Sequence, residues 1–416
     1  MARKFWLRFK RTEGIEDEPE YHSVLDVGTT WVKTLVVARQ DGQVRVIGRG
    51  RAHHRGAFSA SGKVADMNAL TVACEAALCQ AEDMTEETAE RKIVPDTAVI
   101  GVPARWLIVT SQSFVRRRSR PETPVEEQEV EQVIERAGRL AYQKALSRAA
   151  TSIPLKLLDA SLVSLTLDGH RVTDPLGFRG GELGATVCVA VAAEEDLMTL
   201  HALAEALELE SVHLLAEPQA VARQLGRDGI VLDVGGVTTS VYLMRHGTLL
   251  TADTLPLGGD SLAQSLAAVF NLSGRQVQAL RRAYVNGLLA AEDAAQVRVV
   301  LADTLQSWLQ AVEGCLARLA GADYLPHQIY LCGGGSRWPD LLDAARTRAW
   351  MQSLPFVRYP QVQLLDPVQF ACPFNGTARH WDIEETVVLS LACSPALSGE
   401  GREERSISNL LRNIAE

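Results

Sequence analysis

The sequence predicts an α/β protein made of two lobes with related architecture. The chain has 416 residues, which is too long for one compact domain, because domains commonly run to roughly 100–200 residues. A strand followed by a glycine–threonine turn occurs twice, in residues 24–30 and again in residues 230–239. Strand-like and helix-like patterns alternate around both copies. Two copies of one pattern, far apart in the chain, indicate two lobes that face each other.

Composition narrows the class of protein further. Hydrophobic residues make up 47% of the chain and charged residues 22%, which is typical of a globular protein and excludes collagen, coiled coil and wholesale disorder. The formal net charge is 42 − 51 = −9, which argues against nucleic acid as the main partner. The seven cysteines are scattered, so we expect reduced, buried side chains in a cytoplasmic protein. No apolar run approaches the roughly 20 residues of a membrane-spanning helix.

The first lobe is expected to begin after a charged segment. Five basic residues lie in positions 3–11 and five acidic residues in positions 13–20, before the first strand-like pattern. From residue 23 an apolar run leads through the first glycine–threonine turn to a second β-rich segment, which predicts an antiparallel meander. Residues 66–92 are rich in alanine, leucine and glutamate and predict a helix, and residues 97–102 predict a strand.

A change of pattern after residue 101 predicts a separate small α+β unit. Residues 106–115 alternate like a strand, and strand-like stretches return at 155–168 and 184–192. A turn-rich stretch of glycine, proline and aspartate separates the last two. The block 102–192 is therefore expected to be an insertion in the first lobe.

Inside this block the sequence predicts where the helix starts. Thr123 and Glu126 have the spacing of a capping box, and Pro124 occupies the first helical position, so a helix is expected to begin there. The preceding basic run, residues 116–120, is interpreted as a solvated hairpin face, with a partner-binding surface as the alternative.

The second half repeats the plan of the first. After the second glycine–threonine turn, Asp260 lies where a helix opens, a long amphipathic helix covers residues 297–319, and residues 328–332 form a strand that runs into three glycines. The expected organisation is a tail at 1–21, lobe I at 22–101, 193–226 and 372–396, the insertion at 102–192, lobe II at 227–371, and a tail at 397–416.

The glycine–threonine turns could be plain hairpins, because glycine supplies positive φ and threonine hydroxyls bond to nearby backbone. As a facing pair, however, their exposed backbone N–H groups would bind phosphate oxygens from two sides. The aspartate beside each turn, Asp26 and Asp233, could then position a magnesium-bound water. Lys33 could also reach a phosphate, although a lysine that alternates outward from a strand is more often solvated.

The ordered motifs resemble the nucleotide site of the actin-like ATPase superfamily. They are Asp26-Val27-Gly28-Thr29-Thr30, Glu217-Pro218, Asp233-Val234-Gly235-Gly236-Val237-Thr238-Thr239, and Cys332-Gly333-Gly334-Gly335. They are similar, in order, to the first phosphate loop, the first connecting segment, the second phosphate loop and the adenosine loop. The stretch 172–183 of the insertion resembles the inserted subdomain of the bacterial cell-division FtsA and pilus-assembly PilM families, and residues 280–287, which include Arg281, resemble a helix of the FtsA family. The resemblance covers roughly residues 22–394 and implies an actin-like two-lobed fold with a small α+β subdomain inserted in the first lobe.

The resemblance also implies a site for ATP and Mg²⁺. Asp26 and Asp233 would organise the metal and its waters, and Glu217 would orient the attacking water; these three form the catalytic set. The remaining residues would bind the nucleotide: Gly28, Thr29, Thr30, Gly235, Gly236, Thr238, Thr239, Arg281, Gly333, Gly334 and Gly335.

Three positions depart from the family pattern. Val237 and Ser240 stand where the second loop usually has a glycine and an aspartate, and Gln278 stands where FtsA usually has a glutamate. These departures affect hydrolysis more than binding, so the chain could be a slow ATPase or could bind ATP without hydrolysing it.

The function expected from this resemblance is an ATP-binding cytoskeletal scaffold that recruits protein partners at the inner face of the cell membrane, in division as FtsA does or in pilus assembly as PilM does. Self-association into filaments is expected on the same grounds. Peripheral membrane contact would come from a terminal tail. A small-molecule kinase of the same superfamily is less favoured, because no substrate-side base was found. A heat-shock-type chaperone is also less favoured, because it would need a long substrate-binding region beyond the second lobe.

Overall fold

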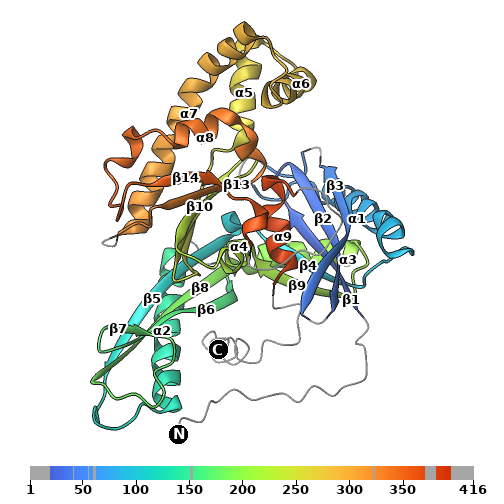
Figure 1. The fold of residues 1–416 in the computed structure, drawn as a ribbon. Helices are drawn as coiled ribbons and strands as arrows, with labels where there is room; N and C mark the ends of the chain where they lie inside the picture. The colour runs from blue at the N-terminus through green and yellow to red at the C-terminus, as the bar shows by residue number, and fades with distance from the viewer. Residues whose placement is uncertain are drawn as a thin grey trace.

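The computed structural model describes residues 19–40, 42–54, 56–59, 62–149, 153–321, 324–370 and 381–394. Within these residues the chain forms two mixed β-sheets with helices packed on them, and the two sheets belong to different lobes (Figure 1). The expected tails fall almost wholly outside these residues. No helix of the described part is long and apolar enough to cross a bilayer.

The first sheet has the strand order β3-β2-β1-β4-β9. Its strands are β1 (Glu20–Val27), β2 (Trp31–Gln40), β3 (Gln43–His53), β4 (Thr97–Val102) and β9 (Ser211–Ala216). The strands β1, β2 and β3 form the predicted antiparallel meander, and β4 and β9 continue the sheet in parallel with β1. This order places the end of β1, with Asp26, in the middle of the sheet.

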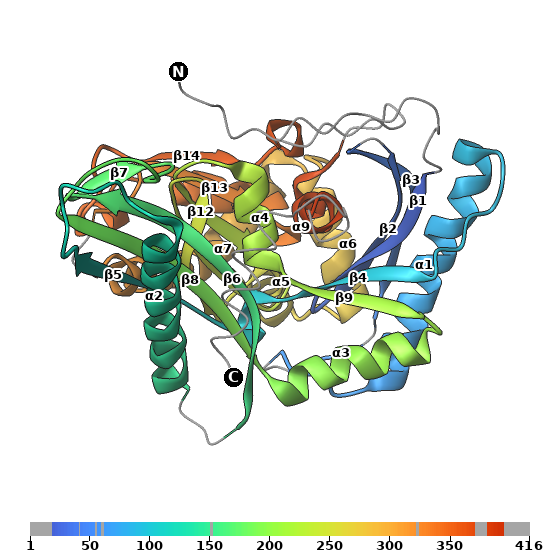
Figure 2. The ribbon, with the colours of Figure 1, turned by 90° about the horizontal axis from the view of Figure 1, so that it is seen from below.

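Helices pack on both faces of the first sheet (Figure 2). The helices α1 (Met67–Ala89) and α3 (Glu194–Ala206) share a core with Leu25 of β1, whereas α4 (Glu217–Leu225) and α9 (Thr386–Ala392) share a core with Val24. Consecutive residues of a strand point to opposite faces, so this alternation follows from the apolar run of β1. The segment that contains α9 therefore returns to the first lobe.

The second sheet repeats the first. Its order is β14-β13-β10-β11-β12-β5-β8-β6-β7, with β10 (Gly229–Val234), β11 (Thr239–Arg245) and β12 (Thr248–Leu255) in an antiparallel meander and β13 (Gln328–Cys332) and β14 (Gln361–Leu364) parallel to β10. The helices of this lobe are α5 (Gly259–Phe270), α6 (Gly274–Val285), α7 (Ala291–Ala320) and α8 (Pro339–Ala345). The prediction of two related lobes is confirmed.

The inserted block contains β5 (Leu107–Arg117), α2 (Glu127–Arg148), β6 (Leu155–Leu167), β7 (His170–Val172) and β8 (Glu182–Ala193). The helix α2 packs on the sheet through a stripe that includes Val133, Ile134, Ala137 and Ala141. In sequence the block lies between elements of the first lobe, yet a single residue pair, Val109 with Ala252, joins β5 to β12 of the second lobe. The block thus extends the second sheet in space.

The predicted start of α2 was wrong by several residues. Val125 pairs with the turn-rich stretch instead, because its N–H donates to Phe178 O at 2.7 Å and its carbonyl accepts from Gly177 N at 3.1 Å. The helix begins after Glu126, whose N–H donates to the Glu129 carboxylate at 3.2 Å. A capping box is present, but its members are Glu126 and Glu129.

The interpretation of residues 116–120 as a uniformly solvated face was also wrong. The side chain of Arg118 is only 2% exposed and forms an ion pair with Glu129 at 2.8 Å. Its guanidinium also donates to the carbonyls of Thr123, Pro124 and Gly180. Arg117, in contrast, is 89% exposed. One arginine of the run therefore holds the turn together.

Candidate functional site

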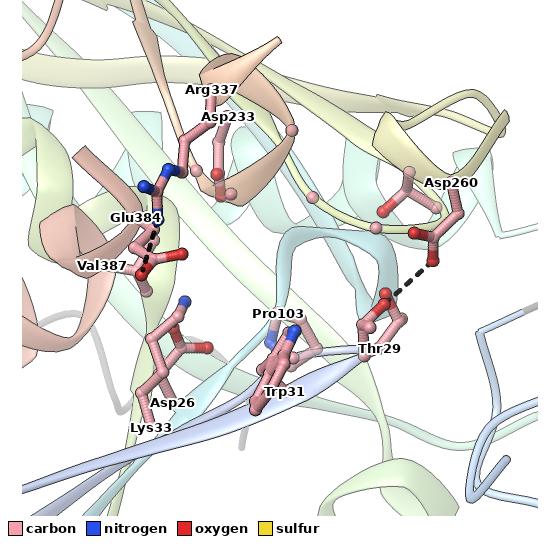
Figure 3. Close-up of a pocket in the computed structure, with 18 of the residues that line it drawn as sticks. Asp26, Thr29, Trp31, Lys33, Pro103, Asp233, Asp260, Arg337, Glu384 and Val387 are labelled. Atoms are coloured by element: carbon pink, nitrogen blue, oxygen red, sulfur yellow. Dashed lines mark hydrogen bonds and ion pairs between the residues drawn. The ribbon is translucent and has the colours of Figure 1, made fainter. Parts of the chain in front are cut away.

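A cavity of about 430 Å³ lies between the lobes, where both glycine–threonine turns and the glycine triplet meet. Of the 14 residues that the sequence assigned to a site, all but Thr239 line it. Figure 3 shows Asp26 and Lys33 next to each other on one side of the cavity, with Asp233 and Arg337 across from them. The predicted motifs are thus brought together from both sheets.

The first turn is held in shape by its backbone and by a histidine. Gly28 N donates to Trp31 O at 3.1 Å, and His54 Nε2 donates to Gly28 O at 3.0 Å. Burial lowers the pKa of His54, and the Ala57 N–H donates to its Nδ1 at 3.3 Å, so the neutral ring carries its proton on Nε2. These hydrogen bonds hold the backbone of the first turn in place beside the cavity.

Lys33 is an ion-pair partner, not a solvated lysine as the strand pattern suggested. Its Nζ lies 2.9 Å from Asp26 Oδ2, and its side chain is 16% exposed. Burial disfavours its charge, but the carboxylates of Asp26 and Asp233 outweigh that effect and raise the pKa of Lys33. A fixed positive charge therefore stands beside the first turn.

The second turn contacts the first directly. Gly235 N donates to Thr238 O at 2.8 Å, and the Val237 N–H donates to Thr29 Oγ1 at 3.4 Å. A Cβ on Gly236 would overlap the hydroxyl of Thr30, so only glycine fits at that position. Residues of both turns consequently line one shared space, as an anion-binding site between the lobes would require.

Two buried carboxyl groups complete this end of the cavity. Burial, with a smaller contribution from Asp26, raises the pKa of Glu217 well above its usual value, and Glu217 Oε1 has no hydrogen-bond partner among the described residues. Burial and Asp26 also raise the pKa of Asp233 to about 6, although Lys33 and the Tyr242 hydroxyl, which donates to Asp233 Oδ2 at 3.2 Å, oppose this. Crowded carboxyl groups of this kind would be stabilised by a cation.

These carboxylates fit a hydrated Mg²⁺. No three described His, Cys, Asp or Glu side chains are arranged to enclose a metal ion. Mg²⁺, however, retains several waters and usually takes one or two carboxylates together with phosphate oxygens. Asp26 and Asp233, on opposite lobes and close enough to affect each other's charge, match that arrangement.

The glycine triplet lines the cavity next to the second turn. Gly333 has φ +84°, and a Cβ there would overlap Asp233 Oδ1, so both its conformation and its surroundings require glycine. Arg281 of α6 donates to Gly334 O at 3.2 Å and lies over Trp338, with its guanidinium carbon 5.5 Å from the ring centre. Backbone and a planar cation here can accommodate a base and ribose.

Thr239 lies outside the cavity. It is completely buried, and its hydroxyl donates to Leu257 O at 2.7 Å. Thr239 Oγ1 in turn accepts a hydrogen bond from Trp308 Nε1 at 2.9 Å. Both hydrogen bonds join Thr239 to residues of the second lobe, so Thr239 belongs to the core of that lobe.

Other lining residues were missed by the sequence interpretation. They are Asp260, which accepts a hydrogen bond from Thr30, and the network of Arg51, Glu384 and Arg337, together with Arg105. Arg51 also lies 3.9 Å from the ring centre of Trp31. Glu384 comes from the segment that returns to the first lobe, so no local spacing connects it with Arg51.

Comparison with known proteins gives a consistent result. No family model matches the chain. The cell-division protein FtsA of Neisseria meningitidis serogroup B is 28% identical over 264 residues, which cover 61% of this chain and 58% of that protein. FtsA of Streptococcus pneumoniae is 24% identical, covering 77% of this chain and 72% of that protein, and FtsA of Bacillus subtilis is 23% identical, covering 90% and 89%. The chain thus spans less than two thirds of the Neisseria protein.

Among solved structures, a chain of the PilM-PilN type IV pilus biogenesis complex is similar with a TM-score of 0.60 and 17% identity, covering 91% of this chain and 98% of that one. The ethanolamine utilization protein EutJ from Carboxydothermus hydrogenoformans gives a TM-score of 0.50 at 13% identity, covering 91% of each. The chain therefore has the actin-like ATPase fold. Within that fold, it resembles the cell-division protein FtsA in sequence and PilM in structure, as its motifs indicated.

Proposed function

We propose that this chain binds ATP with Mg²⁺ between its lobes and acts as an actin-like scaffold in cell division. The observation that carries the proposal is the meeting of two aspartate–glycine–threonine turns, one from each lobe, at a cavity that also contains the glycine triplet. The FtsA proteins, which are similar over most of the chain, supply the cell-division part.

Each part of the cavity has a role in this proposal. The backbone N–H groups of the two turns bind phosphate oxygens, and Lys33 neutralises part of their charge. Asp26 and Asp233 hold Mg²⁺ through its waters, and Arg281 and the glycine triplet contact the nucleoside. Mg²⁺ neutralises phosphate charge when it is bound.

Hydrolysis is expected to be slow. The carboxyl group of Glu217 reaches the cavity and is the candidate for orienting water, but burial favours its protonated form. Ser240 also lines the cavity, so a hydroxyl stands where the family usually has a carboxylate. Binding would then control the state of the scaffold more than turnover does.

Calorimetric titration of the full chain with ATP, with and without Mg²⁺, tests the proposal. Asp233→Ala removes a charge from the cavity and is expected to weaken Mg²⁺-dependent binding by about tenfold or more. Asp303→Ala, on the exposed surface of α7, is the matched control and should bind as wild type does. Equal binding by wild type and Asp233→Ala, or no binding by wild type, would refute the assignment.

A role in pilus assembly is the second candidate. The structural alignment with a chain of the PilM-PilN complex covers 98% of that chain and has a TM-score of 0.60. The genes that flank this one distinguish the two candidates, since division genes support the first and pilus genes the second. In both candidate functions the partners are proteins. Filament formation by the purified chain with ATP can be followed by sedimentation.

We place the scaffold at the inner face of the cell membrane, in contact with it through a terminal tail. The segments that would make this contact, residues 1–12 and 403–416, lie outside the described residues. The inserted block 102–192 is the proposed partner-binding unit, because α2 and its strands form a core of their own.

A further inference from the structure

Arg105 lies at the junction between the first lobe and the inserted block. It belongs to a single turn, η1 (Ala104–Trp106), which follows β4 and precedes β5, and it lines the cavity between the lobes. Because β4 pairs in parallel with β1, this turn lies at the same edge of the sheet as the first glycine–threonine turn. An arginine is thereby placed close to where phosphates would bind.

The side chain of Arg105 is held in place by one hydrogen bond and two aromatic rings. Its Nε donates to Gly62 O at 3.0 Å, and its guanidinium carbon lies 5.2 Å from the ring centre of Phe58 and 5.3 Å from that of Trp106. The ring of Phe58 in turn packs against His54, the residue that binds Gly28 O. The guanidinium is thus connected by packing to the first turn.

One end of this fixed guanidinium has no acceptor. The Nη2 atom of Arg105 is buried and has no hydrogen-bond partner in the described part of the chain. Leaving a charged donor buried without an acceptor is unfavourable, so such a group generally has a ligand or water as its partner. The same is true of Glu217 Oε1, an unpartnered acceptor that lines the same cavity.

The charge of Arg105 is only partly compensated by its surroundings. Burial lowers the pKa of Arg105, and the nearby Glu217 and Asp26 offset this effect only in part. Lys33 is already paired with Asp26. A triphosphate that enters beside Asp26 and Asp233 would gain from a further cation, and Arg105 provides one with an unused donor.

We propose that Arg105 donates a hydrogen bond to the terminal phosphate of a bound nucleoside triphosphate and so distinguishes the triphosphate from the diphosphate. This inference rests on the proposed function, since it assumes that a nucleotide occupies the cavity. Arg105 stands two residues before the first residue of β5, so the contact also connects the terminal phosphate with the root of the inserted block.

A purely structural role for Arg105 would be to hold the loop at Gly62. Trp106 Nε1 donates to the same carbonyl at 3.0 Å, so the loop keeps one donor when Arg105 is replaced. The variant Trp106→Phe removes the other donor without changing the charge of the cavity. It therefore serves as the matched control for loop anchoring.

The test is calorimetric titration of the full chain with Mg-ATP and with Mg-ADP. Arg105→Gln is expected to weaken ATP binding by about tenfold or more and ADP binding by less than about threefold, because only ATP has the terminal phosphate. Trp106→Phe should change both affinities by the same factor. Arg105→Lys, which keeps the charge but not the planar pair of donors, should give an intermediate selectivity.

The outcomes separate the two proposals. If Arg105→Gln and Trp106→Phe change both affinities equally, or if Arg105→Gln changes neither, Arg105 is only a structural residue. If Arg105→Gln does not fold, the selectivity of Arg105→Lys decides, and a selectivity equal to that of wild type overturns the inference. If wild type binds neither nucleotide, the proposed function is wrong and this inference is wrong with it.

Discussion

The hydroxyl of Thr30 donates a hydrogen bond to Oδ2 of Asp260 at 3.0 Å, and these residues lie 230 positions apart in the chain. Thr30 belongs to the first turn, whereas Asp260 lies in the first turn of α5 in the second lobe. Asp260 Oδ1 is also 3.8 Å from Arg281 Nη1. One carboxylate therefore connects the first turn, in the first lobe, with Arg281 of α6 in the second lobe.

This contact should contribute measurably to the stability of the ligand-free chain. Thr30→Val keeps the shape of the side chain and removes the donor, so we expect the free energy of unfolding to fall by about 1 kcal/mol. Denaturant titration measures the change. Thr186→Val, which removes an exposed hydroxyl paired with Ser113 at 2.8 Å, is the control and should have little effect. Equal losses of unfolding free energy in the two variants would show that the hydrogen bond between the lobes stabilises the chain no more than an exposed one does.

Thr238 and Thr239 are expected to behave in opposite ways. Thr239 makes two hydrogen bonds in the core, so Thr239→Val should lower the melting temperature and leave the affinity for ATP nearly unchanged. Thr238 lines the cavity, so Thr238→Val should weaken ATP binding and leave the melting temperature nearly unchanged. Thermal unfolding gives the melting temperature of each variant, and calorimetric titration gives its affinity for ATP. The reverse pattern would mean that Thr239 is a ligand residue after all.

Arg118 and Arg117 are neighbours with very different expected effects. Arg118→Met leaves Glu129 without its ion pair and three carbonyls without a donor, so we expect a loss of about 2–3 kcal/mol in unfolding free energy. Arg117→Met alters an 89% exposed side chain and should cost less than about 0.5 kcal/mol. Denaturant unfolding compares them, and similar losses would contradict the assigned role of Arg118.

The same ion pair predicts a pH dependence. The hydrogen bond from Arg118 lowers the pKa of Glu129 below its usual value of 4.5, so the pair stabilises the folded state at pH values above that range. As the pH falls through the lowered pKa, Glu129 becomes protonated and this stabilisation is lost. The stability difference between wild type and Glu129→Gln should therefore shrink as the pH falls below the usual value of 4.5. A difference that stays constant as the pH falls through this range would rule out a charged pair.

The sequence predicted those parts of the site that follow from local patterns. The meanders are encoded by alternation and turn residues, and each Asp–Gly–Thr turn directly follows a buried strand, as at Asp26 and Asp233. The alternation of β11 would also have corrected one assignment, because Thr238 and Ser240 line the cavity and Thr239 must then face the core.

Other features depend on contacts that no local pattern encodes. Asp260 could be assigned to a helix start, but its contact with Thr30 requires the two lobes to be placed against each other. Arg105 and Glu384 reach the cavity from a turn and from a returning segment, each with unremarkable neighbours in sequence. Residue spacing predicts what one element can present, whereas such contacts depend on how distant elements pack.

The two terminal stretches of the chain are expected to bind a membrane with different strength. Phe5, Trp6 and Phe9 lie outside the described residues and are interspersed in sequence with five basic residues, each of which would contribute about 1 kcal/mol near an anionic surface. The stretch 403–416 also contains apolar residues, but its glutamates weaken attraction to anionic lipid. The N-terminal stretch is therefore expected to be the stronger anchor.

Co-sedimentation with anionic and neutral lipid vesicles measures this contact. We expect the full chain to pellet with anionic vesicles at low salt and much less at high salt, because charges near the membrane surface are screened over about 10 Å at 0.1 M salt. Deletion of residues 1–12 should abolish pelleting, and deletion of residues 403–416 should reduce it only slightly. If both deletions pellet as the full chain does, or if the full chain stays in solution, neither tail is the anchor. Any association with the membrane would then have to come from a bound partner.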